Sequence, residues 1–236
     1  MKKLIDLTLN DFKLIYRTPS LRAFLVMPGI IFIVVLVLLP MLVENFPSVE
    51  PYLPPILIVA TFELTQMFGF IYCMVLIEEK ETAVAKIYGV LPVSKIGFVL
   101  ARLFIPTLIT TVLTFILLEA QTFYPVAVVP NLVFSLIAGL LVPVYILGIS
   151  VLAKNRMAGM VWIKVFNIAV VIPVIAFFIP QRFTPLFGIF PTHWPYQGFF
   201  SLLEGEAFLW QLIIGLFYLG GLLVIAVRKF ALSHFV

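Results

Sequence analysis

The residue with the clearest chemical potential is Glu63, an acid inside a long apolar run. A carboxylate facing lipid costs at least a few kcal/mol, so an acid at this depth is a functional candidate by default. Gln66 and Phe70 share its face at helical spacing, and Asn167 is a deep polar residue in a later apolar run. We expect these four side chains to line a pathway. Two alternatives stay open: a protonated Glu63 bonded to a neighbouring helix, and Asn167 bonding across a helix interface.

The sequence lacks the residue patterns that catalysis and metal binding need. The sequence has no P-loop, no His-Glu-x-x-His, no Gly-x-Ser-x-Gly and no acid cluster suited to metal-dependent lipid chemistry. Its two histidines, His193 and His234, are expected on opposite sides of a membrane, so they cannot share a metal ion. We therefore expect no catalytic residue, no metal site, no cofactor and no enzyme activity in this chain.

The composition places most of the chain in lipid. Of the 236 residues, 63% are hydrophobic and 11% are charged, whereas a soluble domain is about half apolar and a quarter charged. The net charge of +4 does not indicate nucleic acid here, because in a membrane protein the position of the basic residues matters more. We predict an all-α, polytopic protein with a single transmembrane domain in a bacterial-type inner (plasma) membrane.

Six apolar runs are long enough, at about 20 residues, to cross a bilayer. They cover about 22–43, 54–77, 97–118, 132–153, 158–180 and 208–227. With six crossings, 14 of the 15 Lys and Arg residues fall on one side, and only Arg182 falls on the other. Basic residues concentrate on the cytoplasmic side, so both termini are predicted to be cytoplasmic.

Residues 1–20 are predicted to form an amphipathic helix in the cytoplasmic interface. Apolar residues, including Phe12 and Tyr16, recur on one side, and Lys13 and Arg17 lie on the other. Pro19 is expected to break this helix. The alternative is a solvated basic tail.

The 78–96 connection is the longest on the predicted cytoplasmic side. Its charged start favours an extension of the second span into water, Gly89 and Pro92 break that helix, and Ser94 is placed to cap the next one. We expect a compact helical elbow that projects from the membrane and can transmit force to a soluble partner. An ordinary solvated loop is the alternative.

The charged run, followed by Leu91-Pro92-Val93-Ser94 and a further apolar span, resembles the permease subunits of type 2 ATP-binding-cassette exporters, in particular drug exporters. The resemblance implies a second permease subunit, identical or homologous, and a separate ATPase that binds ATP and Mg²⁺. It also implies that this connection carries the coupling helix that docks on the ATPase. The residues expected to make that contact are Glu79, Glu81, Ile87, Leu91, Pro92, Val93 and Ser94.

Residues 181–207 lie on the predicted outer side yet are rich in aromatic residues. Tyr196, Phe199 and Phe200 fall at helical spacing after Pro195, which predicts a short amphipathic helix. The segment around Trp194 resembles a Pro-x-x-Trp-Pro pattern of drug-export permeases, and this implies that these four aromatic residues help to close an outer gate. The alternative is an aromatic belt at the membrane surface without a gating role.

Two other functions remain open at this stage. A haem-export type permease of cytochrome maturation has a similar length and number of spans. A stand-alone ion-coupled carrier or membrane enzyme would need convergent polar groups at one depth, and the sequence offers little beyond Glu63 and Asn167. The apolar and aromatic composition of the predicted pathway suits an amphipathic or lipid-like substrate.

Overall fold

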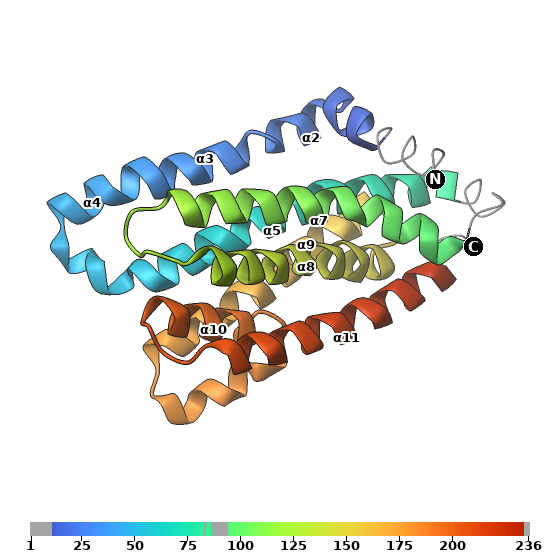
Figure 1. Ribbon diagram of the computed structural model, residues 1–236. Helices are drawn as coiled ribbons and strands as arrows, with labels where there is room; N and C mark the ends of the chain where they lie inside the picture. Colours follow the sequence, from blue (N-terminus) through green and yellow to red (C-terminus); the bar gives the residue numbers. More distant parts are fainter. Residues whose placement is uncertain (1–10, 83, 86–93, 234–236) are drawn as a thin grey trace.

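The computed structural model describes residues 11–82, 84–85 and 94–233, and this part of the chain is helical without strands (Figure 1). Six of its helices are long and apolar enough to cross a membrane, which confirms the predicted fold class. The elements are α2 (Pro19–Phe24), α3 (Met27–Ile33), η1 (Val34–Leu38), α4 (Leu39–Asn45), η2 (Pro47–Tyr52), α5 (Leu53–Glu81), α7 (Lys95–Ala120), α8 (Val128–Leu152), α9 (Arg156–Val171), η3 (Ile172–Phe178), η4 (Gln181–Ile189), α10 (His193–Leu203) and α11 (Leu209–Ser233).

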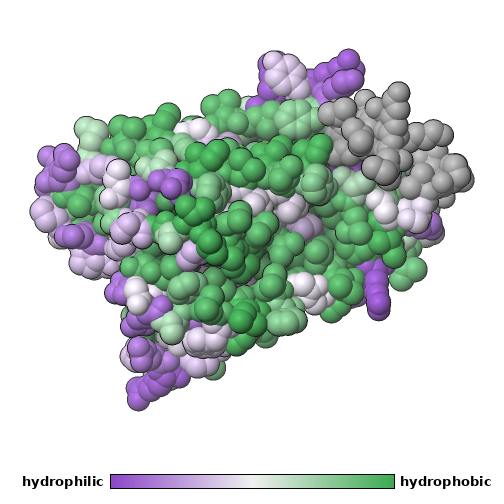
Figure 2. Space-filling view, in the orientation of Figure 1, coloured by the Kyte–Doolittle hydropathy of each residue, from purple (hydrophilic) through white to green (hydrophobic). Residues whose placement is uncertain are grey.

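The helices run lengthwise, so that polar residues collect at two ends. At one end, on the right in Figure 1, α5, α8 and α11 finish and α7 and α9 begin. Apart from Arg182, the described Lys and Arg residues lie toward this end, which we call the basic end. The other, where α10 lies, we call the α10 end. Figure 2 shows a largely hydrophobic face between the ends, as expected for a surface that meets lipid.

Helix α8 forms the centre of the bundle and packs against α5, α7, α9 and α11. Of the residues in its membrane-spanning stretch, 72% are buried. Close packing depends on Gly139, where a Cβ atom would lie 2.1 Å from Thr111 Oγ1 and 3.2 Å from the Thr107 carbonyl oxygen of α7. Thr65 of α5 donates a hydrogen bond to the Ala138 carbonyl at 3.1 Å. Small residues and interhelical hydrogen bonds therefore hold the centre together.

The first span lies at the edge of the bundle and is irregular. Only 17% of the residues in its membrane-spanning stretch are buried, and its α3 segment packs on α5 (Figure 1). A π-helical turn, η1, precedes Pro40 in α4. Because proline lacks an N–H and clashes with the carbonyl one turn earlier, a regular α-helix cannot run through this position.

The segment before the first span is helical over residues 11–17 and is followed by Pro19 at the start of α2. It contacts the bundle through Asp11 and the fully buried Ile15, which lies in a cluster with Phe230 of α11. Phe12 and Tyr16, on the predicted apolar side, are exposed and can face lipid. Residues 1–10 of the predicted interfacial helix lie outside the described residues.

We predict that Gly139→Leu separates α7 from α8, because the new side chain meets Thr111 and the α7 backbone. The expected loss is about 1–3 kcal/mol of unfolding free energy, typical of an overfilled core. Gly220→Leu is the matched control, since no atom lies within 4 Å of its added Cβ. Denaturant unfolding of the purified protein in mixed micelles measures both. Equal stability of the two variants would contradict the close α7–α8 contact.

Candidate functional site

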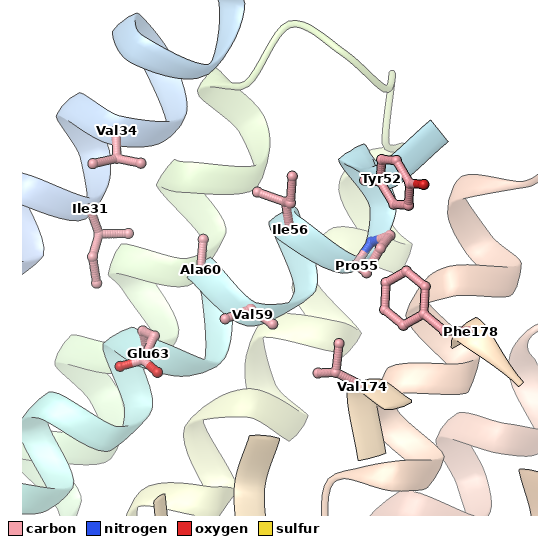
Figure 3. A pocket seen from close by; sticks show the side chains of 10 residues that line it. All are labelled: Ile31, Val34, Tyr52, Pro55, Ile56, Val59, Ala60, Glu63, Val174 and Phe178. Carbon is pink, nitrogen blue, oxygen red and sulfur yellow. The ribbon is translucent and has the colours of Figure 1, made fainter. Parts of the chain in front are cut away.

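A groove of about 400 Å³ opens on the side of the bundle near the α10 end. The first span forms one wall, α5 forms the floor and η3 forms the other wall (Figure 3). Its lining is almost entirely apolar and contains one charged residue, Glu63; the lining residues are Ile31, Val34, Tyr52, Pro55, Ile56, Val59, Ala60, Glu63, Val174 and Phe178. The irregular η1 and η3 segments form its walls because Pro40 and Pro173 interrupt regular helices there.

Glu63 lies at the end of the groove opposite Tyr52 and Phe178, with its carboxylate between α5 and the first span (Figure 3). At 1.5 Å per residue it is about 15 Å along α5 from Leu53, deep in the span. The side chain is half-buried and accepts a hydrogen bond from Gln66 Nε2 at 3.1 Å. Glu63 is therefore an acid at membrane depth on an accessible groove.

The other predicted pathway residues do not line this groove. Gln66 is buried and reaches Glu63 only through its amide. Phe70 packs against Phe24 of α2, with ring centroids 4.4 Å apart. Asn167 of α9 accepts a hydrogen bond from Tyr145 of α8. This bond across a helix interface was the alternative to pathway lining. The single predicted site thus separates into one groove residue and three packing or supporting residues.

Helix α10 covers the α10 end of the bundle with its aromatic side chains. It begins at His193, two residues before the predicted start at Pro195. Tyr196 and Phe199 are fully buried, and Phe199 stacks on Phe134 of α8 with centroids 4.0 Å apart. Tyr196 packs edge-on against Phe62 of α5 and donates a hydrogen bond to the Val170 carbonyl oxygen at 2.9 Å. These contacts bring α5, α8, α9 and α10 together.

The two remaining aromatic residues of the predicted gate lie at the edge of this contact. Phe200 stacks on Phe177 of η3 at 4.8 Å, and Trp194 packs edge-on against Trp210 of α11 at 5.9 Å. On the opposite face of this amphipathic helix, Ser201 is also buried and accepts a hydrogen bond from Gln211 of α11. Helix α10 is therefore packed on both sides, between the bundle and α11.

A pocket of about 480 Å³ with both apolar and polar lining residues, absent from the sequence predictions, lies between α10, η3, η4 and the start of α11. His193 Nδ1, Gln197 Nε2 and Gln211 Oε1 have no hydrogen-bond partner among the described residues. Burial lowers the pKa of His193, which favours its neutral form. His193 and Gln197 lie one turn apart on α10, but Gln211 comes from α11, so only packing brings the three together. No described group of three His, Cys, Asp or Glu residues is arranged to hold a metal ion.

At the basic end, Arg102 of α7 binds two carboxylates. Its Nε and Nη2 donate to Asp11 at 2.6 Å, and its Nη1 and Nη2 donate to Glu79 at 2.6 and 2.8 Å. All three side chains are nearly inaccessible, with 3% of Arg102, 5% of Asp11 and 6% of Glu79 exposed. Both oxygens of Glu79 bind Arg102 inside the bundle in this conformation, and its predicted contact with an ATPase stays a prediction.

The described part of the 78–96 connection gives a mixed result. Ser94 accepts a hydrogen bond from the Gly97 N–H at 3.1 Å, which confirms its predicted cap at the start of α7. Glu81 is exposed at the last position of α5. The remaining predicted coupling residues, Ile87, Leu91, Pro92 and Val93, lie outside the described residues.

Arg102→Leu should destabilise the protein by about 3–5 kcal/mol, because it leaves two buried carboxylates without their cation. Arg156→Leu is the matched control at the same end. Arg156 and Glu78 also form an ion pair, but their side chains are 45% and 30% exposed, so its loss should cost about 0–1 kcal/mol. Unfolding in mixed micelles compares the two. A loss from Arg102→Leu no greater than that of the control would contradict the buried cluster.

The Asp11 carboxyl should make stability depend on pH. Burial raises the pKa of Asp11 to about 6, and the Glu79 charge adds to this effect, although Arg102 opposes it. The hydroxyl of Tyr72 in α5 also interacts electrostatically with the Asp11 carboxylate. With a folded-state pKa above the unfolded value, the contribution of Asp11 is complete below about pH 4 and is lost as the pH rises through about 6.

We therefore predict that the thermal midpoint of the wild-type protein falls, relative to that of Asp11→Asn, between pH 4 and 7. The asparagine does not titrate, so the difference between the two proteins isolates the Asp11 carboxyl. Each pKa unit is worth about 1.4 kcal/mol. If the wild type instead gained stability over Asp11→Asn as the pH rose, the Asp11 pKa would be lowered and Arg102 would outweigh burial.

Comparison with known proteins agrees with a membrane transport chain. Residues 11–227 match the family described as fluoroquinolones export permease protein Rv2686c-like. Two relatives, the fluoroquinolones export permease proteins Rv2686c and MT2760 from two strains of Mycobacterium tuberculosis, are each 23% identical over 235 residues, covering 95% of this chain and 92% of the relative. No solved structure matches the chain. This chain belongs to the Rv2686c-like family of export permeases.

Proposed function

We propose that this chain is one half of the transmembrane pathway of an ATP-driven exporter. A second permease, identical or homologous, completes the pathway, and separate ATPase subunits bind ATP and Mg²⁺. Membership of an export permease family and the absence of a P-loop from the sequence support this assignment. In this proposal the basic end is cytoplasmic, because Lys and Arg concentrate on that side of an inner membrane.

The observation that carries the proposal is the continuity of α5 between the groove and the Arg102 cluster. One unbroken helix, Leu53–Glu81, bears Glu63 toward the α10 end and Glu79 at the basic end. Through Arg102, Glu79 is bound to α7 and to Asp11 in the segment before the first span. A displacement of the 82–94 connection would therefore move the ends of α5 and α7 together, and α5 would carry the motion to the groove.

The ATPase must also be able to shift the conformational equilibrium of this chain. A ligand shifts a conformational equilibrium only if it binds the two states with different free energies. In our proposal the ATPase does so through the 82–94 connection, whose apolar residues Leu91 and Val93 suit a groove in a protein. Glu81, exposed at the end of α5, adds a charge to this surface.

At the other end, α10 is proposed to close the exit. Its buried Tyr196 and Phe199 hold α5, α8 and α9 together, so that an opening toward the outside would have to break these contacts. The substrate is proposed to be an amphipathic aromatic compound, with fluoroquinolones as the first candidates. Both named relatives are called fluoroquinolones export permeases, and the groove lining is apolar.

We predict that Leu91→Asp combined with Glu81→Lys releases the ATPase and abolishes export, while the spans still fold. The test co-expresses the tagged chain with candidate ATP-binding-cassette ATPases from the same genome, then measures co-purification, ATP turnover and fluoroquinolone accumulation in cells. Glu79 is left intact, because its substitution would break the buried cluster.

Glu204→Lys is the control for charge reversal, since Glu204 is exposed at the α10 end. It should leave ATPase binding unchanged. Unchanged association and export in the Leu91→Asp, Glu81→Lys protein would show that the ATPase docks elsewhere. The absence of any ATPase from complexes of the wild-type chain would contradict the proposal that this chain is part of an ATP-driven exporter.

A further inference from the structure

Glu63 is an acid without a counter-ion among the described residues. The described ion pairs join Arg102 to Asp11 and Glu79, and Arg156 to Glu78, and none of them includes Glu63. The amide of Gln66 donates one hydrogen bond to Glu63, but an amide is neutral and cannot balance a carboxylate. At this depth an ionised group needs a partner of opposite charge, which the groove can receive from outside.

The rest of the groove suits an apolar body. Tyr52 and Phe178 stack at 6.0 Å at the end away from Glu63 (Figure 3). Between them and Glu63 the lining is aliphatic, with Val59 of α5 and Val174 of η3 facing the space. An elongated molecule could therefore place an aromatic or aliphatic part against this wall and a positive charge beside the carboxylate.

We infer that this groove binds amphipathic organic cations, with Glu63 as the counter-ion of the bound charge. The inference rests on the proposed function only in treating the groove as part of an export pathway. The selectivity itself follows from the charge at the groove: a neutral molecule leaves Glu63 unpaired, and an anion is repelled by it.

Charge also argues against the other occupants of such a groove. A lipid acyl chain would fill the apolar part but leave the carboxylate unpaired. A second copy of this chain seated here by a two-fold axis would bring a second Glu63 toward the same interface, and like charges in an apolar contact are costly. An organic cation satisfies both the apolar wall and the acid.

The test compares two probes of nearly equal size and opposite charge, tetraphenylphosphonium and tetraphenylborate. The full-length chain is purified into lipid nanodiscs together with any subunit that accompanies it, and binding is measured by calorimetry without nucleotide. Empty nanodiscs supply the background of partition into lipid. We expect saturable binding of tetraphenylphosphonium and no Glu63-dependent binding of tetraphenylborate.

Glu63→Gln should weaken tetraphenylphosphonium binding by about tenfold or more, because the bound charge loses its partner. Glu63→Asp keeps the charge and should retain most of the affinity. Glu44→Gln makes the same chemical change at an exposed acid in the first span and should have no effect. Should Glu63→Gln fail to fold, Val59→Trp, which fills the groove without changing its charge, should also abolish binding.

Equal tetraphenylphosphonium affinity in wild-type, Glu63→Gln and Val59→Trp proteins would overturn the inference. Binding is measured without ATP, so a failure to recruit an ATPase leaves this result standing. Conversely, loss of cation selectivity would leave ATPase co-purification unchanged.

Discussion

The bond between Arg102 and two carboxylates is the interaction on which the basic end of this protein depends. Three charged side chains are buried there, and removing them from water is costly unless each is paired and hydrogen-bonded. Arg102 meets this need with four hydrogen bonds, shared between Asp11 and Glu79. The cluster therefore joins the segment before the first span, the end of α5 and the start of α7.

The α10 end is held in a different way. Aromatic stacking of Phe199 on Phe134, together with the Tyr196 hydroxyl bound to the Val170 carbonyl, fixes α10 over the spans. Aromatic contacts add about 0.5–1.5 kcal/mol each beyond area burial, less than the cost of breaking a buried ion pair.

The groove lies where the helices are least regular. Pro40 and Pro173 interrupt the first and fifth spans, and the resulting η1 and η3 segments stand beside the regular α5. Open space at this depth is tolerated because the lining is apolar, apart from Glu63. Proline thus shapes the walls, and α5 supplies the one charge.

The sequence by itself determined that most of the chain lies in lipid, that six spans cross the membrane, and that nearly all basic residues fall on one side of it. Each of these depends on local composition. The sequence also predicted the Ser94 cap and the short aromatic helix, since both follow from spacing of a few residues. Tertiary structure alone decided the pairing of Arg102 with Asp11 and Glu79, the burial of Glu79, and the separation of Glu63 from Phe70 and Asn167. Helical periodicity specifies which residues share a face, but which helix that face meets is set by packing across residues that are distant in sequence.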